Sequence, residues 1–383
     1  MQGVVSILLV VFLVASSSCS CARIPDGFNG VNAFQKAWRD VCGASGRAPT
    51  LNIPKGKTFM LQPVLFEGPC KSPTINFKVE GNIVAPKSIR EWKWQDNEKG
   101  RWIRFSNIVG LVINGGGQID GQGAAWWNDC KDNCVKPTGF QLHSCKNLQL
   151  SELTYLNNPK NHISINGCDG AQISKLRIIA PEDSPNTDGI DISESSNVRI
   201  ENSFIGTGDD CIAINGGTSF INITNVFCGP GHGISIGSLG KDGTYETVEE
   251  IHVQNCTFRG TQNGVRIKTW QGGKGYARKI TFEDITLEAT KNPVIIDQYY
   301  NPNDNLDAEA MKVSDVTYRN VHGTSMTEKA INLNCDKTMA CTNIVMDRIS
   351  ITSAVPGKNT FAFCFNAHGI VTNSVPNVAG MLQ

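Results

Sequence analysis

Three carboxylates and one histidine recur at a regular spacing in the middle of this 383-residue chain. Asp188, Asp210 and His232 follow one another at intervals of 22 residues, and Asp209 directly precedes Asp210. Carboxyl groups held together can divide the work of acid and base, one protonating a leaving oxygen while another activates water or attacks carbon. Crowding of like charges raises at least one pKa, which keeps a proton available. The spacing therefore indicates hydrolysis of a glycosidic bond.

Two cations follow the histidine on one short alternating segment. Arg266 and Lys268 flank the apolar Ile267, so both are predicted to project to the outer side of the same strand. Flanking cations suit a sugar that itself carries a carboxylate. Any one of these charges, taken alone, is more often a turn residue or a solubility charge. Their coincidence in one register is what indicates a site.

The elements that must position these residues form an internal repeat. Short β-branched segments alternate with period two and are separated by Gly, Asn, Asp and Ser. The repeats are far too short to be domains, and helical periodicity between them is nearly absent, which predicts an all-β parallel β-helix solenoid rather than a β-sandwich. The clearest copies are His162–Asn166, Gly189–Ser193, Cys211–Asn215, Gly233–Gly237, Gly264–Lys268, Pro293–Asp297 and Ala330–Asn334.

The repeat also predicts which residues are neighbours. Successive rungs of a sheet lie ~4.8 Å apart, so the residues that precede each copy should form one row. Asp188, Asp210 and His232 are expected on three successive rungs of this row, with asparagines that hydrogen-bond along the stack at positions 161, 263 and 292. A short helix near the start, with Val31, Phe34, Trp38 and Val41 at helical spacing, is predicted to cap the open N-terminal end.

Composition and the N-terminus place the chain outside the cytoplasm. Lys+Arg and Asp+Glu balance at 35 each, so no global charge favours nucleic acid or a membrane surface. The apolar run Ile7–Ala15, followed by the small residues Ser20-Cys21-Ala22, predicts a signal peptide over residues 1–22 and a single secreted catalytic domain over residues 23–383. No later segment is long and apolar enough to span a membrane.

Twelve of the 14 cysteines remain after removal of that signal. In an oxidising compartment the close pairs are expected to be disulfides, whereas the remaining cysteines are expected to be small buried side chains. The expected pairs are Cys130 with Cys134, Cys211 with Cys228, Cys335 with Cys341 and Cys42 with Cys70, and the expected free thiols are Cys145, Cys168, Cys256 and Cys364. Asn222 and Asn255 begin glycosylation sequons.

Four motifs in order resemble those of plant polygalacturonases. The resemblance covers most of the chain, from about Phe34 to Asn366, and is carried by Ser184–Ile190, Gly206–Cys211, Cys228–Ser238 and Gly264–Gly273. It implies a right-handed parallel β-helix that hydrolyses the α-1,4-galacturonosyl linkages of pectin or polygalacturonate with inversion. It further implies a monomeric, secreted cell-wall enzyme without a cofactor or a metal.

The resemblance also implies a role for each candidate residue. Asp209 would be the general acid, and Asp188 with Asp210 would position and deprotonate the attacking water. His232 would tune the protonation of the acid. Four residues would bind substrate: Arg266 and Lys268 at the galacturonate carboxylate, and Asn186 and Tyr300 along the cleft.

The chain departs from the family pattern at three places. Ile24–Phe28 follows the signal almost directly, where relatives usually carry a first strand and a turn. The cysteine that usually follows Tyr300, with its partner, is absent, and so is the one expected after Pro376, which would leave Cys364 unpaired. We expect these departures to affect the stability of the protein more than its catalysis.

Several functions remain as alternatives. The segment Lys268–Gly273 resembles the endo-acting plant members of the family more than the exo-acting pollen members, which favours endo action. Exo action would need a loop that closes one end of the cleft, for which Asn301–Asp307 is the candidate. A pectate-lyase-like β-helix would need a carboxylate cage for Ca²⁺ beside an exposed base. A catalytically inactive carbohydrate-binding wall protein is the alternative from a different functional class.

Overall fold

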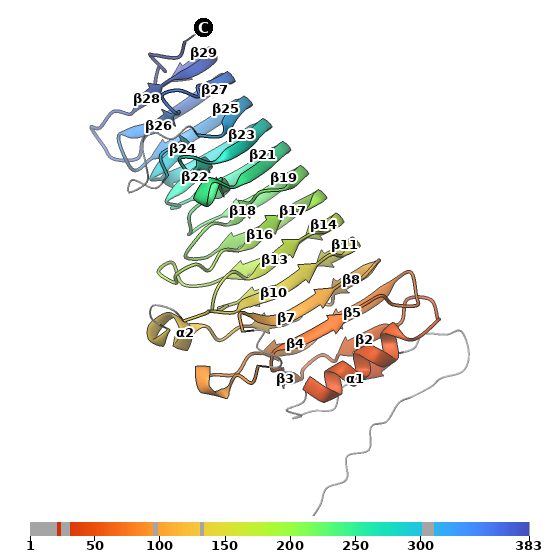
Figure 1. Ribbon diagram of the computed structural model, residues 1–383. Helices are drawn as coiled ribbons and strands as arrows, with labels where there is room; N and C mark the ends of the chain where they lie inside the picture. Colours follow the sequence, from red (N-terminus) through yellow and green to blue (C-terminus); the bar gives the residue numbers. More distant parts are fainter. Residues whose placement is uncertain (1–20, 24–30, 95–98, 131–133, 301–309, 383) are drawn as a thin grey trace, which may run out of the picture.

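The computed structural model describes residues 21–23, 31–94, 99–130, 134–300 and 310–382. In these ranges the chain winds into parallel rungs that stack along one axis, from the N-terminal helix α1 to the last strand β29 (Figure 1). Each rung contributes one short strand to the first of two sheets and one or two strands, often fused into a longer bent one, to the second.

The first sheet, here called the site sheet, has 11 strands, each parallel to its neighbours. In spatial order they are β4 (Val64–Glu67), β7 (Arg101–Ser106), β10 (Thr138–His143), β13 (Ile163–Asn166), β16 (Ile190–Ser193), β18 (Ile212–Ile214), β20 (Ile234–Leu239), β22 (Asn263–Thr269), β24 (Asn292–Asp297), β26 (Lys329–Asn334) and β28 (Phe361–Phe365).

The second sheet, the back sheet, has 18 strands. Its strands are β1 (Cys21–Arg23), β2 (Thr50–Ile53), β3 (Thr58–Met60), β5 (Ile75–Val79), β6 (Asn82–Val84), β8 (Leu111–Asn114), β9 (Gln118–Asp120), β11 (Lys146–Ser151), β12 (Thr154–Leu156), β14 (Asp169–Ser174), β15 (Arg177–Ile179), β17 (Ser196–Gly206), β19 (Thr218–Cys228), β21 (Tyr245–Arg259), β23 (Lys274–Thr290), β25 (Lys312–Ser325), β27 (Cys341–Ser353) and β29 (Ala367–Val375).

The register of the site sheet is the one that the repeat predicts. Ile190 pairs with Ile212, Ile212 with Ile234, and Ile234 with Val265. These side chains are fully buried and stack as continuous apolar rows inside the coil. Because side chains alternate along a strand, the residues between them face outward on the same rungs.

The helix α1 (Val31–Cys42) covers the N-terminal end of the solenoid as predicted (Figure 1). Its buried face carries Phe34, Trp38 and Val41, and the Trp38 ring packs against Phe66 and Phe105 of the first rungs. A second helix, α2 (Ala124–Asp129), was not anticipated, because its six residues are too few to show a helical period. Two 3₁₀ turns, Ile89–Glu91 and Lys241–Gly243, complete the helical elements of the described ranges.

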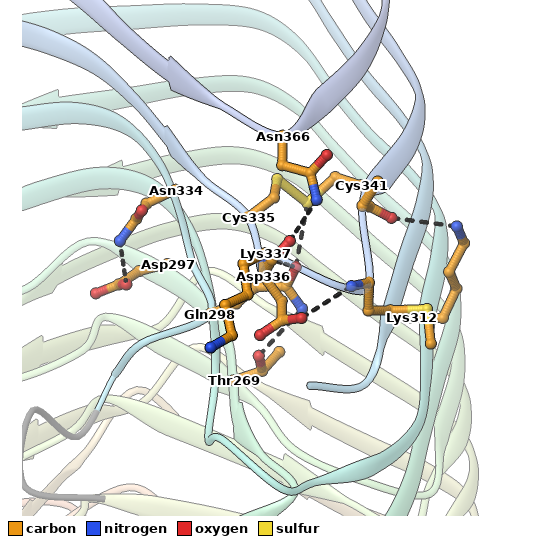
Figure 2. Close-up of a disulfide and its surroundings, with 12 residues drawn as sticks. Thr269, Asp297, Gln298, Lys312, Asn334, Cys335, Asp336, Lys337, Cys341 and Asn366 are labelled. Carbon is orange, nitrogen blue, oxygen red and sulfur yellow. Dashed lines mark hydrogen bonds between the residues drawn. A yellow bond between two sulfur atoms is a disulfide. The ribbon is translucent and has the colours of Figure 1, made fainter. Parts of the chain in front are cut away.

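All four expected disulfides are present. They join Cys42 to Cys70, Cys130 to Cys134, Cys211 to Cys228 and Cys335 to Cys341. Figure 2 shows the last of these at the C-terminal end of the coil. The thiols of Cys145, Cys168, Cys256 and Cys364 are free, as predicted; the first three are buried, and Cys364 is half-buried.

Most of the predicted signal peptide lies outside the residues that the structure describes. Residues 1–20 lie outside the described ranges, and the expected cleavage point after Ala22 falls within β1. Among the described residues, no helix is both long and apolar enough to cross a membrane.

Candidate active site

The predicted row of polar residues lies at the start of three adjacent strands of the site sheet. Asp188, Asp210 and His232 each stand two residues before the first paired residue of β16, β18 and β20. Backbone hydrogen bonds from Gly189 N to Asp210 O and from Cys211 N to Gly233 O hold this register. The three side chains therefore lie on successive rungs, as the 22-residue spacing predicts.

The segment around His232 depends on two glycines. Gly231 and Gly233 have φ of 142° and 88°, backbone conformations that L-residues rarely adopt. A Cβ on Gly233 would lie 2.2 Å from the carbonyl oxygen of Asn263 on the next rung. The Gly-His-Gly sequence thus lets the backbone pass close to its neighbour while the imidazole turns toward Asp209.

Asp210 is the most buried carboxylate of the group, with 1% of its surface exposed. Arg266 Nη2 donates to Asp210 Oδ1 at 2.7 Å, and Lys268 Nζ donates to Oδ2 at 3.0 Å. The Ser235 hydroxyl donates to the same Oδ1 at 2.8 Å and accepts from Arg266 Nε at 2.9 Å. Two cations therefore stabilise the negative charge of one nearly inaccessible carboxylate.

Asp209 forms a separate pair with His232. His232 Nδ1 lies 2.9 Å from Asp209 Oδ1, which also accepts from the backbone N–H of Asp210 at 2.8 Å. Burial alone would raise the pKa of Asp209, but the hydrogen bond and charge of His232 outweigh it and lower that pKa. This direction differs from the expectation that the acid would hold the raised pKa.

Asp188 is the carboxylate whose pKa is raised. Burial raises the pKa of Asp188 well above its ordinary value. The negative charges of Asp191, Asp209 and Asp210 raise that pKa further. The crowding of carboxylates thus has the predicted effect, but on Asp188 rather than on Asp209.

Asp191 belongs to the same cluster and was missed by the sequence reasoning. It faces outward from β16, in the row that continues through Ser235 to Arg266. Its Oδ1 is buried and has no hydrogen-bond partner. Burial first, and the charge of Asp210 second, raise the pKa of Asp191 to about 7. The alternation of side chains along a strand, which predicts that Arg266 faces outward, also predicts that Asp191 faces outward.

The predicted substrate-binding residues are only partly brought together. Lys268 is 7% exposed, and its Nζ lies 5.2 Å from the centre of the Tyr300 ring. Tyr300 packs edge-on against Trp270, over which Lys241 Nζ lies at 5.5 Å. Asn186, by contrast, is exposed, has a φ of 57° and makes no side-chain hydrogen bond with the described residues.

The cluster also contains the one set of three potential metal ligands among the described residues. Carboxylate oxygens of Asp209 and Asp210 and an imidazole nitrogen of His232 lie within 4.8 Å of one another. Both Asp210 oxygens already accept hydrogen bonds from Arg266 and Lys268, and Asp209 Oδ1 accepts from the backbone. Ca²⁺ at this place would have to compete with these donors for the same carboxylate oxygens.

The arrangement provides two chemically distinct carboxylates at one place. Asp209 Oδ1 is hydrogen-bonded to the His232 imidazole, and its Oδ2 makes no hydrogen bond with the described residues. Asp188 has a raised pKa, so its ionised form is a comparatively strong proton acceptor. A donor and an acceptor of this kind suit acid–base cleavage of a bond held between them.

Comparison with known proteins identifies relatives that match most of the chain. A family model described as glycosyl hydrolases family 28 matches residues 42–375. A protein named probable polygalacturonase in Arabidopsis thaliana is 50% identical over 353 residues, which cover 90% of this chain and 76% of that protein. An exopolygalacturonase of Zea mays is 40% identical over 363 residues, covering 92% and 86%.

The fold has a counterpart among solved structures. The endo-xylogalacturonan hydrolase from Aspergillus tubingensis aligns with a TM-score of 0.80 at 24% identity, covering 94% of this chain and 100% of that chain. This likeness concerns the fold alone. With it, the predicted right-handed parallel β-helix is confirmed.

Proposed function

The chain belongs to the glycosyl hydrolases family 28 and is a glycoside hydrolase, and we propose that it cleaves the α-1,4-galacturonosyl linkages of pectin as an endo-acting polygalacturonase. The observation that carries the proposal is the grouping of Asp188, Asp209 and Asp210 with His232 and two cations on one outer face. Such a face suits a polymer whose sugars carry carboxylates.

In this proposal Asp209 is the general acid. Its Oδ1 is held by His232 and by the backbone, which leaves Oδ2 to meet the glycosidic oxygen. As the bond between the anomeric carbon and that oxygen breaks, the oxygen keeps the electron pair and takes the proton of Asp209. A lowered pKa makes Asp209 a stronger proton donor, although its protonated form is the less populated one.

Asp188 and Asp210 complete the reaction. Water attacks the anomeric carbon from the face opposite to the leaving oxygen, which inverts the configuration. In its ionised form, which the raised pKa makes the less populated one, Asp188 is the better acceptor of the water proton, while Asp210, fixed by Arg266 and Lys268, holds the water by a hydrogen bond. The two roles differ because only Asp210 is neutralised by cations.

Substrate recognition is assigned to the cations and to the cleft residues. Lys268 uses one N–H on Asp210 and has two more for a galacturonate carboxylate beside it. Tyr300 lies against Lys268 and offers a ring for the sugar, and Asn186 is exposed at the entrance. Endo action requires that the cleft stay open at both ends; the candidate closing segment, residues 301–307, lies outside the described residues.

The enzyme is further proposed to be a monomer that acts in the cell wall after removal of residues 1–22. N-terminal sequencing of the secreted protein should begin at Arg23. Both glycosylation sequons fall within back-sheet strands, Asn222 in β19 and Asn255 in β21, and Asn255 is exposed.

Release of reducing ends from polygalacturonate, with and without a chelator, tests the proposal. Activity that survives the chelator, without ultraviolet-absorbing unsaturated products, is the expected result. Unsaturated products would indicate a lyase, and binding without any cleavage would indicate an inactive wall protein. Early products should be a spread of oligomers with rapid loss of viscosity; monogalacturonate as the sole early product would establish exo action.

A further inference from the structure

Three phenylalanines stand exposed on the last strand of the site sheet. Phe361, Phe363 and Phe365 of β28 are 49%, 42% and 44% exposed. Ala362 and Cys364 between them pack against the core, so the three rings point outward from the coil. We call these three residues the aromatic platform. A cluster of exposed apolar side chains marks a binding surface more often than a single exposed apolar side chain does.

The platform continues the rows that carry the candidate active site. Lys268 pairs with Asp297, Asp297 with Asn334, and Asn334 with Phe365. The neighbouring outward row runs in the same way from Arg266 to Phe363. Three strand steps of ~4.8 Å separate the two ends, a distance of ~14 Å. The platform and the catalytic cluster therefore lie on the same outer face of the site sheet. The strands β22, β24, β26 and β28 follow one another toward the C-terminal end of the coil (Figure 1).

The row between Lys268 and Phe365 is polar, and its two side chains are hydrogen-bonded to each other. Asn334 Nδ2 donates to Asp297 Oδ1, and the two side chains lie next to each other on adjacent rungs (Figure 2). Asp297 Oδ1 also accepts from the backbone N–H of Tyr299. These groups offer hydrogen-bond partners to the hydroxyls of a sugar chain that crosses them.

We propose that the aromatic platform is a distal binding site for the pyranose rings of the galacturonan chain, on the C-terminal side of the bond that is cleaved. This inference rests on the proposed function, because it extends the same polymer along the same face. The C–H faces of a pyranose are apolar and pack on the negative face of an aromatic ring. Lys329 Nζ, 5.6 Å from the centre of the Phe363 ring, adds a cation for a galacturonate carboxylate.

A polymer is the occupant that this geometry favours. The platform is continuous in register with the catalytic face, and a chain that leaves the cluster along the rows must cross it. A short oligomer seated at the cluster does not reach ~14 Å further. The contribution of the platform should accordingly depend on substrate length, which distinguishes it from a structural role of the same residues.

The test compares the double variant Phe363→Ala/Phe365→Ala with the wild type on trigalacturonate and on long polygalacturonate. We expect kcat/KM on the polymer to fall by roughly fivefold per ring, since each loses partial coverage of an aromatic side chain, with no change on the trimer. Phe220→Ala is the matched control, because Phe220 is 57% exposed on the back sheet and should affect neither substrate.

Three other outcomes would overturn the inference. Equal loss on trimer and polymer would indicate a structural role, and unchanged activity on the polymer would remove the site. A concentration-dependent dimer that the double variant abolishes would make a second copy of the chain the occupant. If the wild type cleaves neither substrate, the proposed function fails instead; the platform is then tested by retention on immobilised polygalacturonate, which the double variant should lose.

Discussion

Asp191 offers a test of the electrostatics of the cluster that does not depend on catalysis. Replacement of Asp191 by Asn keeps the size and shape of the side chain but removes its ability to ionise. The carboxyl is held mostly protonated in the folded protein at acid pH, because its pKa is raised to about 7 from an ordinary 3.8. The amide therefore imitates the state that the folded protein prefers.

The sign of the effect follows from proton linkage. Between pH 3.8 and 7 the folded wild type retains a proton on Asp191 that the unfolded chain has released. Stability of the wild type therefore falls as pH rises through this window, and the loss is complete above the folded pKa. At 1.36 kcal/mol per pKa unit, the change from pH 5 to pH 7 is about 2–3 kcal/mol. Asp191→Asn carries no such loss.

The assay is chemical unfolding at pH 5 and at pH 7 for both proteins. Asp191→Asn should gain about 2–3 kcal/mol relative to the wild type between these two conditions. The contribution of Asp188 changes in the same direction, because the negative charge of Asp191, which the variant removes, is one of the causes that raise the pKa of Asp188. Asp183→Asn, in an exposed turn nearby, is the matched control and should follow the wild type.

Parallel pH dependence of the wild type and Asp191→Asn would refute this reasoning. It would mean that solvent or a rearranged neighbour stabilises the ionised carboxylate in the folded protein. The argument that burial and Asp210 govern the protonation of the cluster would then fail for Asp188 as well, since the same causes act on both.

Three further outcomes follow from the structure. Asp209→Asn should lower kcat on polygalacturonate by about 10²–10⁴-fold with little change in KM, because the amide cannot donate a comparable proton; steady-state kinetics that retain kcat would move the acid elsewhere. Lys268→Ala should raise KM on polygalacturonate while highly methyl-esterified pectin stays a poor substrate of the wild type, and equal wild-type rates on both polymers would remove the carboxylate-binding role. The double variant Cys42→Ser/Cys70→Ser should lose about 3–4 kcal/mol of unfolding free energy, since this disulfide closes a loop of 28 residues; an unchanged denaturant midpoint would contradict that estimate.

The sequence alone predicted the architecture and which site residues are neighbours. In a β-helix, residues that are one repeat apart in the sequence lie side by side on adjacent rungs. The 22-residue steps put Asp188, Asp210 and His232 on adjacent rungs, and strand alternation placed Arg266 outward. The four disulfides were also predictable, since close spacing in the chain becomes proximity across or within a rung. The short helix α2 was not, because six residues show no period.

Only the tertiary structure decided how the site residues interact. Rotamers and burial depend on packing between rungs, so the sequence could not show that Arg266 and Lys268 both turn to Asp210. The distribution of protons follows from that packing, which raises the pKa of Asp188 and lowers that of Asp209. The alignment of Phe365 with Lys268 was likewise hidden, because the repeats between them vary in length and only strand pairing fixes the row.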